Sequence, residues 1–118
     1  KWQFDDLGWR IDDLRAQATA AGRNPDAIET HLYHNVNLND DIEAGIDESK
    51  RFLDLYYTAD YSREAVRGWV ALGSAAQVVE KLKRYEALGF TEATLRITSW
   101  NQRAQLDRVI NEVLPHFQ

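Results

Sequence analysis

The side chains best suited to bind a ligand lie in two short segments in which polar and apolar residues alternate. Asn35 and Asn37 share one face of the first segment, while Arg96 and Trp100 come at the end of the second. An amide both donates and accepts hydrogen bonds, and a guanidinium can hold a phosphate or carboxylate in a bidentate pair. Because the chain has 19 acidic residues, a salt bridge from Arg96 to an Asp or Glu is the alternative. Trp100 either lines such a site or is a packing residue.

A second candidate for binding is the helix start at Gly73 and Ser74. Backbone N–H groups and the helix dipole at such a start can hold an anion. Ser74 and Gln77 also match a capping box, in which each side chain binds a backbone N–H group of the other residue. A well-capped helix is therefore the alternative to an anion site.

The three histidines do not form a recognisable metal-binding pattern. His31 and His34 fall on opposite faces of one predicted strand, and His116 lies far along the chain. No His-Glu-x-x-His motif, phosphate-binding loop or Ser-His-Asp arrangement is present. We therefore predict no metal site and interpret His34, on the apolar face, as a hydrogen-bonded core histidine.

Two strands are predicted, over about 29–38 and 93–98, because side chains of like polarity recur at every second position. The apolar faces of the two strands would pack against helices. The pattern is typical of part of a doubly wound sheet or of a barrel, and in a barrel the polar faces would line the interior. The apolar set is Val36, Leu38, Leu95 and Ile97, and the polar set is Tyr33, Asn35, Asn37, Thr94, Arg96 and Thr98.

Five helices are predicted around these strands, giving the order α-β-α-α-α-β-α. Their expected ranges are about 9–21, 42–58, 62–70, 74–88 and 102–115, the last one opening with a capping box at Ser99 and Gln102. Strands separated by so much helix cannot form a hairpin, so they are expected to pair in parallel through a right-handed crossover. No linker or repeat divides the chain, and residues 1–118 are treated as a single unit.

Apolar stripes at helical spacing predict which helix faces are buried. The stripe of the first helix comprises Trp9, Leu14, Ala18 and Ala21, and that of the second comprises Ile42, Ile46, Ser49, Leu53 and Tyr56.

The composition is that of a globular α/β protein with a net charge of -5. An acidic chain with no basic run disfavours binding to nucleic acid, and no apolar run is long enough to span a membrane. The absence of cysteine and of a signal-like N-terminus fits a cytoplasmic protein. The chain begins at Lys1 and contains no methionine, so we expect either that a start was removed or that the sequence is a segment of a longer protein.

Five segments of the chain, taken in order, resemble the luciferase-like flavin-dependent monooxygenases. They are LRAQATAAGRNPD at 14–26, NLNDDIEA at 37–44, LGSAAQV at 72–78, LGFTEATLR at 88–96 and VLPHF at 113–117. The chain departs from the family pattern at Ala75 and Ala76, where the family has Pro and Glu.

The resemblance implies the C-terminal portion of a TIM-like (β/α)8 barrel from a flavin-dependent oxidoreductase. Such enzymes use FMN or F420, and most flavin contacts would lie outside this chain. Within it, Asn35, Asn37, Arg96, Trp100, Gly73 and Ser74 are the expected substrate-binding or cofactor-binding residues. The alternative is a non-catalytic, truncated barrel that has lost the flavin site. Such a module would cover its sheet edges by self-association, and a homo-oligomer is expected.

Overall fold

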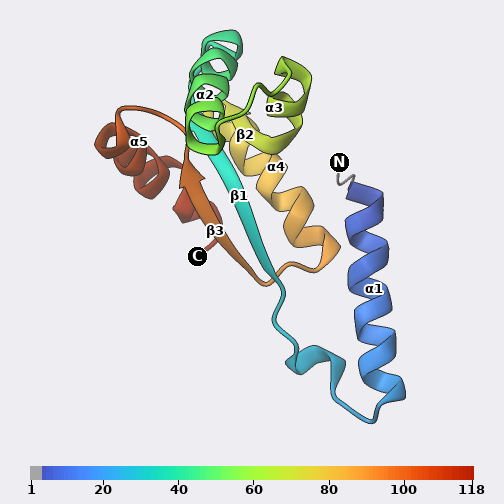
Figure 1. The fold of residues 1–118 in the computed structure, drawn as a ribbon. Coiled ribbons are helices and arrows are strands. Elements are labelled where there is room, and N and C mark those ends of the chain that lie inside the picture. Colours follow the sequence, from blue (N-terminus) through green and yellow to red (C-terminus); the bar gives the residue numbers. More distant parts are fainter. Residues whose placement is uncertain (1–3) are drawn as a thin grey trace. The chain divides into compact units, whose positions relative to one another are not determined.

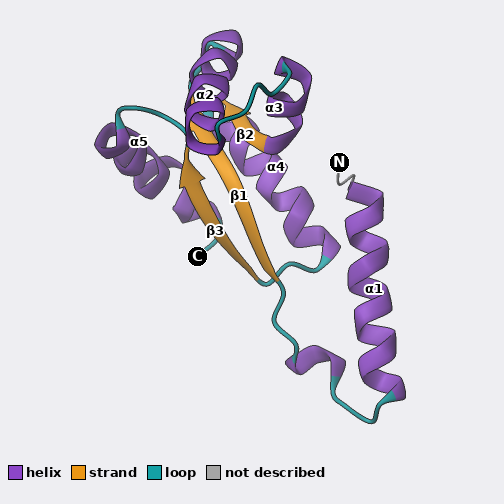
Figure 2. Cartoon of the chain, viewed as in Figure 1, coloured by secondary structure: helices purple, strands orange, loops and turns teal. Residues whose placement is uncertain are grey.

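A three-stranded sheet forms the centre of the fold. The computed structural model describes residues 4–118, and its strands are β1 (His31–Leu38), β2 (Val70–Gly73) and β3 (Glu92–Ile97), in the order β2-β1-β3. β1 pairs in parallel with β2, and β3 runs in the same direction on the other side of β1 (Figure 2). The two predicted strands are confirmed. The prediction of only two strands is wrong, because it placed the residues of β2 in a helix and the turn after it.

The five predicted helices are all present. They are α1 (Phe4–Ala20), α2 (Ile42–Tyr57), α3 (Arg63–Trp69), α4 (Ala75–Leu88) and α5 (Gln102–Arg108), with a short 3₁₀ turn at Pro25–Ala27. A π-helical stretch (Val109–Val113) and a 3₁₀ turn (Leu114–His116) extend α5. α1 begins five residues earlier than the sequence pattern indicated.

The chain divides into two compact units. The smaller unit comprises residues 1–32 and 83–94, and the larger comprises residues 33–82 and 95–118. The boundaries fall inside β1, α4 and β3. The predicted site residues all belong to the larger unit.

In the smaller unit, the turn at Gly89 connects α4 to β3. Gly89 has a φ of 110°, a conformation that glycine adopts without strain, as expected for a helix stop. Its carbonyl accepts hydrogen bonds from Thr30 Oγ1 at 2.6 Å and from Arg15 Nη2 at 3.2 Å. Segments far apart in the sequence are thereby joined at this turn.

The buried face of α1 differs from the predicted stripe. Ile11 and Ala18 are buried, whereas Trp9 and Leu14 are exposed. Ile11 and Ala18 are seven residues apart, which places them on one side of a helix. The prediction was wrong at Trp9, Leu14 and Ala21, because hydrophobicity alone does not say which of two apolar stripes packs against the rest of the protein.

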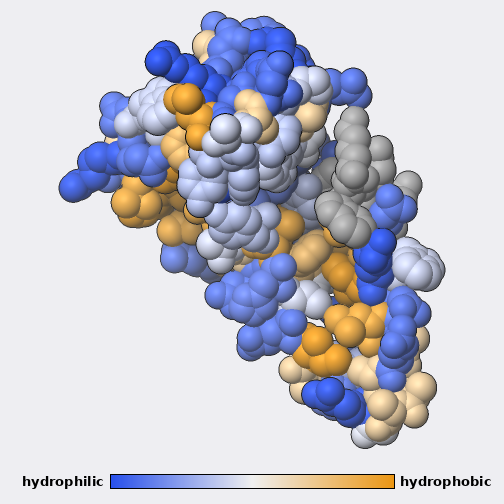
Figure 3. Space-filling model, in the orientation of Figure 1, coloured by the Kyte–Doolittle hydropathy of each residue, from blue (hydrophilic) through white to orange (hydrophobic). Residues whose placement is uncertain are grey.

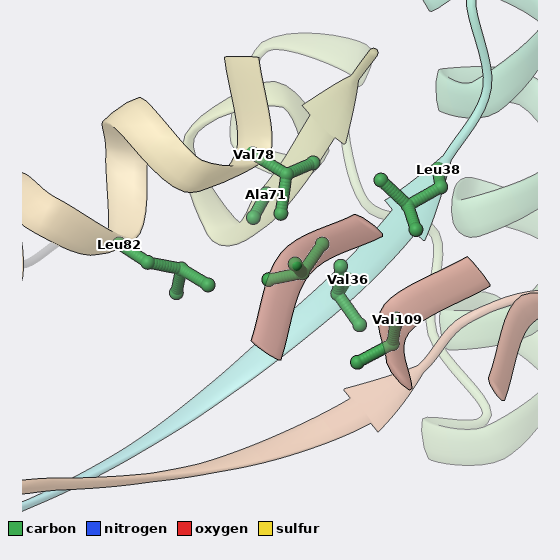
Figure 4. Close-up of a cluster of buried hydrophobic side chains, with 7 residues drawn as sticks. Val36, Leu38, Ala71, Val78, Leu82 and Val109 are labelled. Carbon is green, nitrogen blue, oxygen red and sulfur yellow. The ribbon is translucent and has the colours of Figure 1, made fainter. Parts of the chain in front are cut away.

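One face of the sheet in the larger unit packs against α4 and the C-terminal helical segment, which comprises α5 and the two short helical stretches that extend it to His116. Figure 4 shows the side chains of this core converging from the strands and the helices. The predicted apolar face is confirmed, since Leu95 and Ile97 pack against the same cluster. The buried members are Val36, Leu38, Ala71, Val78, Leu82, Val109 and Val113.

The other face of the sheet is covered by α2 and α3, and Figure 1 shows α2 in front of the C-terminal part of β1. Ile46 and Leu53 of α2 are fully buried there together with Val66 and Val70. These α2 residues and Ser49 confirm most of the predicted stripe. Tyr56 was wrongly included in it, since its side chain is 62% exposed.

The two predicted capping boxes have different outcomes. Ser74 Oγ accepts from the Gln77 N–H group, and Gln77 Oε1 accepts from the Ser74 N–H group, which confirms the first. The second is wrong, because Asn101 caps α5 by accepting from the Ala104 N–H group. Gln102 instead donates its side-chain amide to the Ser99 carbonyl. An Asn one residue before the helix is as good a cap as Ser.

Hydrophobic side chains also reach the surface of the larger unit. Figure 3 shows hydrophobic surface beside α5, where Leu106, Ile110 and Leu114 are exposed. No helix within residues 4–118 combines the length and the apolar character needed to cross a membrane.

Candidate functional site

Arg96 and Asn35 meet between neighbouring strands, on the sheet face that α2 covers. The Arg96 Nε–H group donates to Asn35 Oδ1 at 2.8 Å. The Asn35 amide in turn donates to the Trp69 carbonyl at 3.3 Å, and Asn35 is almost fully buried. Asn35 therefore orients the guanidinium of Arg96.

Three tyrosine rings surround the guanidinium of Arg96. Its Cζ atom lies 4.7 Å from the ring centre of Tyr56, 5.2 Å from that of Tyr57 and 5.5 Å from that of Tyr33. Arg96 Nη1 also donates to the Tyr57 hydroxyl at 3.1 Å. Aromatic faces attract a cation, so the rings partly compensate for the loss of water around the charge.

One nitrogen of Arg96 has no hydrogen-bond partner. Nη2 is buried, and nothing in residues 4–118 accepts a hydrogen bond from it. Within the same residues no Asp or Glu forms an ion pair with Arg96, so the salt bridge that was the alternative interpretation is absent there. A buried, unsatisfied donor on a charged group is uncommon in folded proteins and calls for a physical explanation.

Asn37 lies in a separate buried network beneath α2. Its amide nitrogen donates to Glu48 Oε1 at 2.8 Å, to the Thr98 carbonyl at 3.0 Å and to Ser49 Oγ at 3.2 Å. Ser49 Oγ is also 2.8 Å from Thr98 Oγ1. This network joins α2 to both strands, and it engages the amide nitrogen of Asn37, which was expected to line the site.

Trp100 lies at the surface and connects to the tyrosine rings through α2. Its ring centre is 5.3 Å from that of Phe52, and Phe52 stacks on Tyr56 at 6.3 Å. Since Tyr56 also lies over Arg96, a row of aromatic side chains runs from Trp100 to the guanidinium. Trp100 is half exposed, so one side of this row is open to solvent.

Gly73 and Ser74 lie at the end of β2, and their geometry is that of the capped helix. Gly73 has a φ of 105°, and a Cβ atom there would lie 2.2 Å from Gln77 Oε1. The Gln77 side chain thus occupies the space in front of the first N–H group of the helix. An anion would have to displace it.

His34 confirms its interpretation as a core histidine. It is buried on the face of β1 that packs against α4. Burial, followed by the positive charge of Lys81, lowers the pKa of His34 to about 3. The ring is therefore neutral at physiological pH.

His31 lies beside two carboxylates in the smaller unit. Its Nε2 atom is 3.5 Å from Glu29 Oε2 and 3.3 Å from Glu92 Oε2. The possible ligand atoms of these three residues lie within 4.8 Å of one another, but all three side chains are more than half exposed. Exposed groups of this kind commonly meet without binding a metal, and a structural zinc site usually has four ligands.

A shallow hollow of about 340 Å³ lies elsewhere, on the outer side of α2. It is lined by charged residues and contains none of the predicted site residues; its lining is Asp47, Lys50, Arg51, Asp54 and Leu55. We do not assign the site to this hollow, because Lys50 and Asp54 already form an ion pair across it.

The sequence indicated that Asn35, Asn37, Arg96 and Tyr33 share a face, and the structure brings Asn35, Arg96 and Tyr33 together. It places Gly73 and Ser74 apart from that group, and Trp100 reaches the group only through Phe52 and Tyr56. Tyr56 and Tyr57 were not among the predicted site residues, because they come from the end of a helix whose packing on this face is a tertiary property.

Comparison with known proteins gives one sequence match and several structural ones. No protein-family model matches the chain. A flavin-dependent trigonelline monooxygenase, oxygenase component, from Acinetobacter baylyi is 39% identical over 61 residues. That match covers 48% of this chain and 17% of the relative.

Two solved structures share the fold. The coenzyme F420-dependent tetrahydromethanopterin reductase from Methanopyrus kandleri superposes with a TM-score of 0.69 at 16% identity, covering 98% of this chain and 43% of that one. A riboflavin lyase solved with modified FMN and riboflavin gives a TM-score of 0.65 at 15% identity, covering 98% and 36%. The resemblance to luciferase-like proteins and the expected fold, a portion of their TIM barrel, are confirmed. The chain spans less than half the length of each.

Proposed function

We propose that this chain, which has the fold of part of a luciferase-like barrel, is a segment of a flavin-dependent oxidoreductase. The observation that carries the proposal is the group formed by Arg96, Asn35 and the tyrosine rings on one face of the sheet. The flavin-dependent relative and the two structural neighbours support the proposal, since all three names refer to flavin or F420.

The residues of this group fit a flavin-type cofactor and a polar substrate. Arg96 Nη2 is a donor without an acceptor, and Tyr33 and Tyr56 are planar side chains with exposed surface. A bound FMN or F420 would supply the transfer of electrons or hydride. Asn35 would fix the direction of Arg96, and Trp100 would form one wall of the site. Asn37 would hold α2 on the sheet, and Gly73 and Ser74 would hold the start of α4.

The proposed partners are the cofactor and a small molecule. The acidic chain makes nucleic acid a poor partner, because phosphates would be repelled. We retain the cytoplasm as the proposed location, on the basis of the absence of cysteine.

Flavin binding by the purified chain tests this proposal. Titration with FMN and with F420, followed by the fluorescence of the cofactor, measures how much of the flavin site this segment forms by itself. Because most flavin contacts are expected outside this chain, saturable binding at micromolar concentrations would show that the segment alone forms a usable site. Reading the coding frame upstream of Lys1 provides a second test, since further βα units are expected there. A folded chain that binds neither cofactor, with a start codon or processing site directly before Lys1, would exclude the proposal and favour the non-catalytic module.

The exposed stripe on the C-terminal helical segment favours that second candidate function. Leu106, Ile110 and Leu114 are spaced four residues apart and are all exposed. β2 and β3 are both edge strands of the sheet in residues 4–118. A module that self-associates would cover such surfaces. Sedimentation of the wild type and of Ile110→Asp tests this, because a dimer held by the stripe should dissociate in the variant.

A further inference from the structure

The unpaired nitrogen of Arg96 identifies the chemistry of a ligand for the proposed site. Two of the three guanidinium nitrogens already have acceptors, Asn35 Oδ1 for Nε and the Tyr57 hydroxyl for Nη1. Nη2 has none in the described part of the chain. The tyrosine rings attract the charge, but they provide no hydrogen-bond acceptor for Nη2.

The charge of Arg96 is also left without a carboxylate. Many other cations of the larger unit have one. Arg67 pairs with Glu43 at 2.8 Å, and Arg108 pairs with Glu112 at 2.7 Å. Removal of a guanidinium from water is costly unless an anion or several acceptors replace the water. Arg96 thus differs from these arginines in having both a free donor and an uncompensated charge.

We infer that Arg96 Nη2 binds an oxyanion, a carboxylate or a phosphate, carried by a planar ligand of this site. The inference rests on the proposed function and specifies the ligand class of the same site. The oxyanion would accept from Nη2, whose two N–H groups have no acceptor in the described part of the chain. The single N–H of Nε is already used by Asn35, so the bidentate edge formed by Nε and Nη2 is closed. Nη1 keeps one N–H besides the one it donates to the Tyr57 hydroxyl, so the two terminal nitrogens can still share an oxyanion. Charge-assisted hydrogen bonds of this kind are about twice as strong as neutral ones.

The covering tyrosines give the ligand a route to Nη2. Tyr33 is 58% exposed and Tyr56 is 62% exposed, so each ring has room to change rotamer. Exposed side chains change rotamers within picoseconds to nanoseconds. Asn35 and Tyr57 meanwhile keep the guanidinium in place. The rings can then stack on the planar part of the ligand whose oxyanion is bound.

The test is a binding titration of the complete 118-residue chain, monitored by NMR of the tyrosine rings and the Arg96 Nε–H group. Sodium benzoate is compared with benzyl alcohol, and FMN is compared with riboflavin, so that each oxyanion has a neutral counterpart. We expect one oxyanion of these pairs to bind more tightly than its counterpart. In Arg96→Gln that preference should fall at least about tenfold. Arg67→Gln, which removes a surface arginine paired with Glu43, should keep it.

The two pairs distinguish the source of the oxyanion. A preference for FMN that depends on Arg96 identifies the cofactor phosphate, and a preference for benzoate identifies a substrate carboxylate. If neither oxyanion is preferred over its neutral counterpart, or if Arg96→Gln keeps the preference, the inference is wrong. Should Arg96→Gln fail to fold by circular dichroism, Arg96→Lys provides the same comparison, with weakened binding expected because lysine lacks the planar fork.

The inference and the proposed function can fail separately. FMN and riboflavin binding equally well to the wild type and to Arg96→Gln would support a flavin site and exclude the oxyanion contact. Binding of benzoate through Arg96 without any flavin binding would support the oxyanion contact and count against the flavin function.

Discussion

Asn35 holds Arg96 from the neighbouring strand, with 2.8 Å between Asn35 Oδ1 and Arg96 Nε. Asn35→Ala should lower the free energy of unfolding by about 1–3 kcal/mol, because Arg96 Nε and the Trp69 carbonyl each lose a partner. Urea denaturation measures this change. Asn111→Ala, on the exposed side of the C-terminal segment, is the control and should change stability by less than about 0.5 kcal/mol. An equal effect of both substitutions would contradict the role of Asn35.

His34 should make the protein less stable in mild acid. Its pKa is about 3 in the folded chain, below its ordinary value of 6.5, so the unfolded chain binds a proton between these values and the folded chain does not. Stability is therefore complete above pH 6.5 and decreases as the pH falls towards 3, by at most about 1.4 kcal/mol per pH unit.

Denaturation at a series of pH values between 7 and about 4.5 tests the histidine effect above the range in which most carboxylates titrate. His34→Gln should remove most of the slope in this range, whereas His116→Gln, at the exposed end of the chain, should retain it. A slope that persists in His34→Gln would assign the acid sensitivity to other groups.

Gly73 and Gly68 should respond to alanine in opposite directions. Gly73→Ala places a Cβ atom 2.2 Å from Gln77 Oε1 at a φ of 105°, so we expect a loss of about 1–3 kcal/mol and a disrupted helix cap. Gly68 lies in α3 with nothing within 4 Å of the added atom, and Gly68→Ala should stabilise the chain by about 0.5–1 kcal/mol. Thermal unfolding of both variants provides the comparison. Stabilisation by Gly73→Ala would show that the turn does not need glycine.

The cluster of His31, Glu29 and Glu92 should not hold a metal ion. It offers three exposed ligands, and water competes for each of them. Calorimetric titration with zinc should give no saturable binding at micromolar concentrations. Saturable binding that is lost in His31→Ala would overturn this prediction and identify a surface metal site.

Alternation and helical spacing were sufficient to predict most of the fold. Val36 and Leu38 were assigned to the helix-packed face, and the structure buries both there. β2 was missed because Val70–Gly73 is only four residues long and lies directly between two helices. Such a run has no alternation of its own, and its strand character depends on pairing with β1.

The strand residues of the site could be predicted from the sequence, whereas the tyrosines of α2 could not. Period-two spacing places Asn35 and Arg96 on the same face, and their hydrogen bond follows from strand adjacency. The tyrosines at the end of α2 reach Arg96 only because α2 packs across this face. The sequence indicates which side of α2 is apolar, but it does not indicate which face of the sheet that side covers.

The central position of β1 affects how the chain folds as it is synthesised. Both of its partners, β2 and β3, come later in the chain, so β1 is made before either edge can be paired. An unpaired strand with one apolar face is a site for association with other chains. α2 follows β1 directly, and the contact from Ser49 to Asn37 spans only 12 residues. The nascent chain can therefore shield one face of β1 early, and aggregation should be most sensitive to substitutions that weaken this contact.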